Sequence, residues 1–115
     1  MITDVFCKII KGELPSEPVY RDDEIIVIKD IKPSAPVHLL VMPIRHLESL
    51  EEAKQADDSL LGKMLLVAHR VAKEANLDKG YRLVMNNGEH GGQLVPHLHL
   101  HVLGGKRLGA KLVQD

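Results

Sequence analysis

Three histidines, His97, His99 and His101, alternate with leucines near the end of the chain. On a helix, side chains two residues apart point in different directions. On a strand they point to the same side, about 6.6 Å apart along it. Because imidazole titrates at a pH of about 6.5, three such rings on one face are suited to acid, base or nucleophile chemistry. Two alternatives remain open: a metal site made by the same rings, and a polar face without a chemical role.

A glycine-rich loop precedes the histidine row. Residues 86–93 read NNGEHGGQ, in which Gly91 and Gly92 permit positive φ and a close approach of the backbone. Backbone N–H groups exposed in such a loop can bind phosphate oxygens. The segment lacks the lysine of the phosphate-loop pattern, so by itself it also fits a flexible hairpin connection. Beside three imidazoles, we favour the phosphate-binding interpretation.

The elements that must position these residues can be predicted from hydrophobic patterning and turn residues. Asp4 and Gly12 suit the N-cap and the C′ position of an opening helix over 4–12. The longest helix is expected over 60–76, where apolar residues recur every three or four positions. A second short helix is expected after His46. Short β-branched or alternating runs predict five strands, at 19–21, 24–30, 37–42, 81–86 and 95–103.

The order of these elements favours an α+β fold. The strands come in hairpin-like pairs, which favours an antiparallel sheet with helices packed on one face. In the last strand, Leu98, Leu100 and Val102 are expected against the helices, so that the histidines line the opposite face. The chain has 115 residues without a repeat or a linker, and we interpret 1–115 as a single domain.

Composition and charge exclude several classes of protein. The net charge is −1 with histidines neutral, so no general basic field attracts a nucleic acid. No apolar run approaches the roughly 20 residues of a membrane-spanning helix, and no secretion signal is visible. Cys7 is the only cysteine, so an internal disulfide cannot form. We therefore expect a cytoplasmic protein without a nucleic-acid or membrane partner.

The histidine row and four further segments together resemble the histidine-triad (HIT) family, and within it the bacterial type of the Hint branch. The row continues as Val-Leu-Gly-Gly, whereas related uridylyltransferases end it with glutamine and Fhit-type hydrolases usually continue with Pro-Arg. The similarity covers nearly the whole chain. The further segments are FCKIIKGELP at 6–15, DIKPSAPVH at 30–38, YRLVMN at 81–86 and GGQ at 91–93.

The resemblance implies both a fold and an activity. The fold is the HIT fold, a five-stranded antiparallel sheet, with two sheets joining across a homodimer. The activity is hydrolysis of the P–N bond in purine nucleoside 5′-phosphoramidates, such as AMP joined to an amine or to lysine, without a cofactor. Two other functions remain open: a nucleotide-binding regulatory module with little turnover, and a dinucleoside polyphosphate hydrolase.

Four histidines carry the chemistry that the resemblance implies. His99 would attack the α-phosphorus and carry a nucleotidyl-histidine intermediate, while His101 would contact the α-phosphate oxygens. A neutral imidazole is an available nucleophile when an acceptor holds its other N–H, and the family uses a backbone carbonyl of the same strand for this. His97 and His38 would orient the site. From the residues alone, His38 also fits a strand histidine without a role.

The nucleotide-binding residues follow from the same resemblance. Asp30 would accept hydrogen bonds from both ribose hydroxyls, with an Asx turn as the alternative. Ile31 would lie against the base, or else belong to the core. Leu94 stands where eukaryotic Hint proteins have serine, so its side chain cannot donate a proton to the leaving amine. The phosphate would be bound by a larger set: Asn86, Gly92, Gln93, Leu94, His99 and His101.

Cys7 raises the question of a metal. Some bacterial relatives have Cys-x-x-Cys at this place and bind structural zinc together with two distant histidines. This chain has Asp4-x-x-Cys7, with His46 and His97 at the matching positions, and aspartate can also bind zinc. Since a single thiolate is a weak zinc signal, we favour a metal-free interpretation, with Asp4 as an N-cap and Cys7 as a small buried side chain.

Overall fold

The computed structural model describes residues 4–110, which contain a five-stranded sheet in the order β1-β2-β3-β5-β4. Every neighbouring pair of strands is antiparallel, so the predicted sheet is confirmed. The two edge strands and the last strand are shorter than expected. The strands are β1 (Tyr20–Arg21), β2 (Ile25–Lys29), β3 (Val37–Pro43), β4 (Arg82–Val84) and β5 (Leu100–Gly104).

The first helix, α1 (Val5–Ile10), has the caps that the sequence predicts. The Asp4 carboxylate accepts the Cys7 N–H at 2.7 Å, and Gly12 follows the helix with a φ of 79°. The predicted short helix after His46 is absent at that place. The segment instead forms two 3-10 turns, Leu50–Glu52 and Gln55–Asp57, before the long helix begins.

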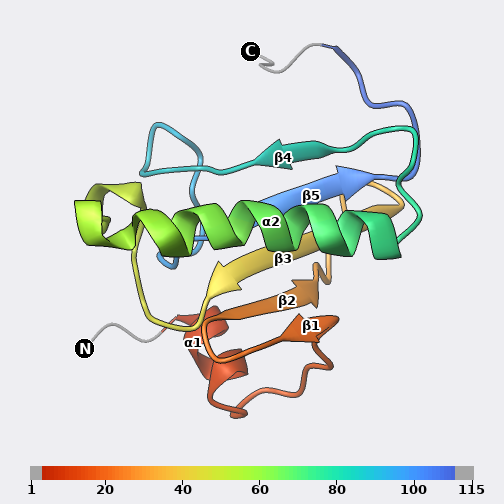
Figure 1. The fold of residues 1–115 in the computed structure, drawn as a ribbon. Coiled ribbons are helices and arrows are strands. Elements are labelled where there is room, and N and C mark those ends of the chain that lie inside the picture. The colour runs from red at the N-terminus through yellow and green to blue at the C-terminus, as the bar shows by residue number, and fades with distance from the viewer. Residues whose placement is uncertain (1–3, 111–115) are drawn as a thin grey trace.

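The long helix, α2 (Asp58–Glu74), crosses one face of the sheet (Figure 1). Its buried side chains pack against Ile25 and Val27 of β2 and against Leu100 and Val102 of β5. This face holds the larger core, as the alternation of β5 predicts. Within residues 4–110, no helix has the length and the apolar character needed to cross a membrane.

The short helix α1 packs on the opposite face, which corrects the expectation that all helices share one face. Phe6 lies there with Ile26 and Ile28 of β2 and with Leu40 and Met42 of β3. The physical reason is that β2 and β3 are apolar on both sides, so that both sides need a cover.

The predicted strand over 95–103 is wrong in its first half, since β5 begins only at Leu100. Pro96 has no N–H to donate, and Leu98 donates its N–H to the Leu47 carbonyl at 2.6 Å, outside the sheet. Leu98 still lies in the core beneath α2. The alternation of side chains therefore continues before Leu100, although the hydrogen bonds between strands do not.

Candidate active site

Three of the four predicted catalytic histidines meet on the face of the sheet that carries α1. His101 lies on β5 opposite Leu40 of β3, and His38 lies two positions before Leu40. The His38 Nε2 and His101 Nδ1 atoms are 2.8 Å apart, and the His99 and His101 ring centroids are 4.9 Å apart. The register of β3 and β5, together with the residue just before β5, therefore forms a continuous row of the three imidazoles of His38, His101 and His99.

The ring of His99 has one nitrogen fixed by its own backbone. Its Nδ1 lies 2.7 Å from the His97 carbonyl oxygen, and a carbonyl can only accept, so Nδ1–H is the donor. In the neutral ring, Nε2 therefore carries the lone pair. Burial lowers the pKa of His99, so that the ring is neutral near pH 7. The segment before β5 thus holds a neutral imidazole in the tautomer that a nucleophile needs.

His38 and His101 form a chain whose protons can be assigned from its first donor. The Ser34 N–H donates to His38 Nδ1 at 3.0 Å, so neutral His38 carries its proton on Nε2. That N–H donates to His101 Nδ1, and the Asp30 Oδ2 atom lies 3.4 Å from the same nitrogen. His101 then carries its own proton on Nε2. Burial, with the neighbouring His99 and His38, lowers the pKa of His101 to about 4.

His97 does not join this row, although the spacing of two placed it on the same face. Its Nε2–H donates to the Pro43 carbonyl at 2.8 Å, and its Nδ1 faces Cys7 and Asp4. The ring is fully buried, and burial lowers its pKa. The contribution of His97 to the row is its carbonyl oxygen, which holds the His99 N–H.

A second group of potential ligands surrounds the His97 ring. Asp4, Cys7, His46 and His97 each bring one ligand atom to a common point, with all four atoms within 4.8 Å of one another. These are the residues that the sequence offers as a zinc alternative. Burial raises the pKa of the Cys7 thiol, so in the absence of a cation this group is protonated near pH 7. The N-cap role of Asp4 is confirmed at the same time.

The predicted nucleoside residues lie at one end of the histidine row. A cavity of about 440 Å³ includes Asp30 and His38 in its lining. Asp30 Oδ1 accepts the Lys32 N–H at 2.8 Å, which is the Asx turn given as the alternative, while Oδ2 faces His38. Ile31 is 93% exposed, so it does not belong to the core. An exposed isoleucine beside a half-buried carboxylate suits a flat apolar ring joined to a sugar.

The glycine-rich loop is held by bonds among its own polar groups and by one bond to Glu48, which lies outside the loop. The Asn86 amide donates to the Gly91 carbonyl at 2.7 Å, and the Gln93 amide donates to the Glu48 carbonyl at 2.6 Å. The Gly92 N–H donates to the Glu89 carbonyl. These N–H groups therefore stabilise the loop itself. A bound phosphate would have to share or replace their hydrogen bonds.

The exposure of Leu94 and a contact of Phe6 were not predicted from the sequence. Leu94 is 94% exposed, so its side chain is open to solvent. Phe6 packs edge-on against the His99 ring at 5.0 Å between centroids, a contact that the sequence analysis missed. The available signal was that Phe6 is the only phenylalanine of the chain and lies on the apolar face of α1.

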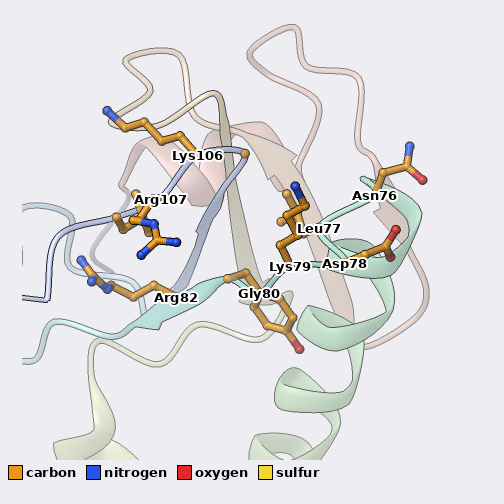
Figure 2. A pocket seen from close by; sticks show the side chains of 11 residues that line it. Asn76, Leu77, Asp78, Lys79, Gly80, Arg82, Lys106 and Arg107 are labelled. Carbon is orange, nitrogen blue, oxygen red and sulfur yellow. The ribbon is translucent and has the colours of Figure 1, made fainter.

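A larger cavity of about 720 Å³ lies away from the predicted residues. It is lined by residues 76–82, which follow α2 and enter β4, and by residues 105–108 after β5 (Figure 2). Its cationic side chains are Lys79, Arg82, Lys106 and Arg107. Size alone would select this cavity, but none of the imidazoles described above lies in it. We place the site at the histidine row because the groups that can act as nucleophile and proton donor lie there.

Comparison with known proteins assigns nearly the whole chain to one family. The family described as scavenger mRNA decapping enzyme C-term binding matches residues 3–112. An uncharacterized HIT-like protein of Buchnera aphidicola is 47% identical over 109 residues, which cover 94% of this chain and 97% of that protein. The likeness therefore extends over both chains and is not confined to the histidine row.

Solved structures agree with the sequence comparison. A HIT family hydrolase from Clostridium thermocellum superposes with a TM-score of 0.93 at 44% identity, covering 98% of this chain and 99% of that chain. A histidine triad nucleotide-binding protein from Candida albicans superposes with a TM-score of 0.85 at 31% identity, covering 98% and 85%. With five antiparallel strands, a buried histidine row and these relatives, the chain belongs to the histidine triad (HIT) family.

Proposed function

We propose that this protein hydrolyses the P–N bond of purine nucleoside 5′-phosphoramidates through a nucleotidyl intermediate on His99. The observation that carries the proposal is the bond from His99 Nδ1–H to the His97 carbonyl, because it leaves the Nε2 lone pair available. The relatives support a hydrolase that binds nucleotides, since one is described as a hydrolase and another as nucleotide-binding. Asp30 and Ile31 favour a nucleoside as the bound group.

The reaction proceeds in two displacements at phosphorus. In the first, His99 Nε2 forms a bond to the α-phosphorus while the P–N bond breaks and its electron pair leaves with the amine, which gains a proton. In the second, water attacks the same phosphorus and loses a proton to solvent, the bond to His99 breaks with its electron pair returning to Nε2, and the nucleoside monophosphate leaves. Dividing one difficult displacement into two easier steps is the usual benefit of a covalent nucleophile.

His101 supplies the proton that faces the phosphate in this proposal. Because its Nδ1 accepts from His38, its Nε2–H is free to donate to a phosphate oxygen or to the departing nitrogen. His38 and Ser34 act through His101 and are positioning residues. The Leu94 side chain has no proton to give, so protonation of the amine depends on His101 or on water.

The ribose and the base would be bound at the other end of the row. Asp30 has two oxygens, and Oδ2 makes only a long contact to His38, so it can accept a ribose hydroxyl. Ile31 exposes its apolar side chain beside this carboxylate. Covering that side chain with a purine would remove apolar surface from water.

The decisive experiment compares wild type with His99→Ala on adenosine 5′-phosphoramidate. We expect a loss of at least about 10³-fold in kcat, because the first displacement loses its nucleophile. Intact-mass measurement after rapid mixing should show a nucleotide-sized adduct in the wild type alone. His69→Ala, which changes an exposed histidine on α2, is the matched control. Equal rates in wild type and His99→Ala would overturn the proposal.

A regulatory module that binds nucleotides with little turnover is the second candidate. The bonds that Gly92 and Gln93 make within the loop favour it. Because the N–H groups of these residues already have acceptors, they would stabilise the charge of a transition state less. Calorimetry with AMP, combined with the absence of turnover on any phosphoramidate, would identify this function. Faster turnover of diadenosine polyphosphates than of phosphoramidates would instead identify a dinucleoside polyphosphate hydrolase.

We also propose that the protein is a homodimer in which the two sheets join. The edge strands β1 and β4 leave backbone groups without a strand neighbour on one side. Leu65 and Leu66 expose 54% and 72% of their surface on α2, which gives apolar area for a second copy. Light scattering coupled to size exclusion should give the mass of two chains, and the mass of one chain would refute this.

A further inference from the structure

Four cationic side chains line the cavity of about 720 Å³ that lies where α2 and β5 end (Figure 2). Lys79 and Arg82 belong to the chain that follows α2 and enters β4, while Lys106 and Arg107 belong to the segment after β5. Among the described residues of the lining, Asp78 is the only carboxylate. Because the whole chain has a net charge of −1, this excess of positive charge is a local feature.

None of these four cations forms an ion pair with an acidic side chain within residues 4–110. The lysine and arginine ion pairs of that part of the chain are made by other side chains, Arg45, Lys63 and Arg70. In Figure 2, Asp78 lies on the opposite side of the cavity from the two arginines. Like charges that share one space repel each other, so an anion bound among them would be stabilised.

The C-terminus of α2 does not account for the four cations. Cationic side chains often bind the free carbonyl groups at the end of a helix. Here the carbonyls of Val71, Ala72 and Lys73 already accept the N–H groups of residues 75–77. The helix dipole adds only about half a negative charge. Four cations and one carboxylate leave an excess of three positive charges in the lining, which is far more than the dipole offsets.

The backbone that carries two of the cations is packed tightly against neighbouring segments. A Cβ atom built on Gly104 would lie 2.8 Å from the Leu77 side chain, and one built on Gly105 would lie 2.9 Å from Pro36. Gly105 also has a φ of 93°, which side chains other than glycine disfavour. The two glycines therefore let the start of the segment 105–108 lie between Leu77 and Pro36, so the cavity wall is part of the fold.

The Arg82 side chain is held in place before any ligand binds. It is half-buried, and its guanidinium donates an N–H to the Gly109 carbonyl. A guanidinium has five N–H donors in a fixed plane, so most of them remain available. This planar group matches the oxygens of a phosphate, to which it can donate two parallel hydrogen bonds. Arg82 therefore favours a phosphate over a less specific anion.

The volume and the charge of the cavity together define the class of ligand. A volume of about 720 Å³ lies within the range of about 300–1,000 Å³ that is typical of small-molecule sites. One phosphate group carries a charge of about −1.5 to −2 at pH 7. A single phosphate therefore leaves positive charge in the lining uncompensated, whereas two phosphates balance the excess of three.

The cavity is separate from the histidine row. Arg82 pairs with Leu103 of β5, and Leu103 pairs with His38 of β3. Arg82 and His38 therefore lie on the same face of the sheet, two strand spacings or about 10 Å apart. Among the described residues of the lining there is no histidine. A ligand in the cavity would thus lie beside the row and leave its imidazoles accessible.

We propose that this cavity binds a small anion that carries two or more phosphate groups, held by Lys79, Arg82, Lys106 and Arg107. The inference goes beyond the proposed function and does not rest on it. Arg82 and Arg107 donate paired hydrogen bonds to phosphate oxygens, and the two lysines neutralise the remaining charge.

Binding can be measured by calorimetry on the full chain with three probes: pyrophosphate, fructose 1,6-bisphosphate and inorganic phosphate. We expect one or both of the first two to bind about 10-fold or more tightly than inorganic phosphate, because a second phosphate engages further charge-assisted bonds. The probe that binds more tightly tells whether the two phosphates are adjacent or separated. Raising the salt concentration should weaken binding, since the lining is partly open to solvent. Failure of both diphosphates to saturate below about 1 mM would overturn the proposal.

A pair of double variants tests whether the cavity holds the anion. Lys106→Gln with Arg107→Gln removes two positive charges from exposed positions, so the fold and Tm should be retained. We expect the dissociation constant to rise by about 10-fold for each charge removed. Lys8→Gln with Lys11→Gln is the matched control, because it removes two exposed positive charges far from the lining residues and should bind like the wild type. Wild-type affinity in the first double variant would refute the assignment.

Amide NMR with the same diphosphates locates the bound anion directly. Chemical shifts should change at residues 77–82 and 105–108. Changes confined to residues 86–101 would assign the anion to the histidine row and its loop, and the proposal would be wrong. A single-stranded oligonucleotide that binds more tightly than either diphosphate would identify nucleic acid as the occupant and would also contradict it. His99→Ala should bind the diphosphates like the wild type, so failure of this proposal and failure of the proposed function can be distinguished.

Discussion

Adding one methyl group at Gly91 tests whether the glycine-rich loop serves the reaction. A Cβ atom built on Gly91 would lie 2.3 Å from the Asn87 carbonyl oxygen and 2.9 Å from the Asn87 nitrogen. Carbon and oxygen atoms in contact need about 3.2 Å or more, so the two parts of the loop must separate by about 1 Å. Both neighbours are backbone atoms, and no side-chain rotation can relieve the clash.

The separation acts directly on the groups that the resemblance assigns to the phosphate. The Asn86 amide binds the Gly91 carbonyl at 2.7 Å, and a shift of about 1 Å breaks this bond. A misplacement of this size can cost about 100-fold in rate, which is equivalent to about 2.7 kcal/mol of transition-state stabilisation. We therefore expect Gly91→Ala to lower kcat/KM by about 100-fold while Tm falls by only a few degrees, since the loop is exposed.

The assay pairs phosphoramidate hydrolysis with calorimetric binding of AMP. Gly109→Ala adds the same methyl group where no atom lies within 4 Å, so it should match the wild type in both measurements. If folded Gly91→Ala hydrolyses phosphoramidate and binds AMP as the wild type does, the loop has no part in the site. The interpretation as a plain hairpin connection would then be correct.

Three further changes test other parts of the structure. Asn76 has a φ of 62°, so Asn76→Ala should lower the free energy of unfolding by about 1 kcal/mol in urea titrations, and Asn76→Gly should not. In the folded chain the pKa of His101 is lowered from 6.5 to about 4. Between these pH values the unfolded chain binds one more proton than the folded chain. The free energy of unfolding should therefore fall as the pH drops from about 6.5 to 4. The loss is at most about 3 kcal/mol before solvent screening, and His101→Asn should flatten it in urea titrations at pH 7.5 and 4.5. Leu94→Ser offers the leaving amine a hydroxyl and should raise kcat severalfold in the hydrolysis assay. Its Tm should stay unchanged because the Leu94 side chain is 94% exposed.

Local patterns predicted most of the fold because they depend on neighbouring residues. The caps of α1 at Asp4 and Gly12 are set within one or two turns of chain. The alternation of Leu98, Leu100 and Val102 follows from backbone geometry alone. The side of the sheet on which α1 packs could not be predicted in this way, because it depends on which apolar face the long helix leaves uncovered.

Contacts between distant segments account for the features that the sequence did not predict. The start of β5 depends on the bond from Leu98 to Leu47, 51 positions earlier in the chain. The packing of Phe6 against His99 joins the first helix to the segment just before the last strand. The exposure of Ile31 excludes its assignment to the core, which a pattern of apolar residues alone could not do.

The three alternating histidines, His97, His99 and His101, show how identical residues acquire different properties. Each ring has a different partner for its first proton: His97 donates through Nε2 to the Pro43 carbonyl, and His99 donates through Nδ1 to the His97 carbonyl. His101 instead accepts at Nδ1 from His38. The free nitrogen is therefore Nδ1 in His97 and Nε2 in His99, while His101 presents an N–H. A spacing of two places the rings, but the partner of each ring decides whether it can be a ligand, a nucleophile or a donor, and these partners come from β3 and from the backbone before β5.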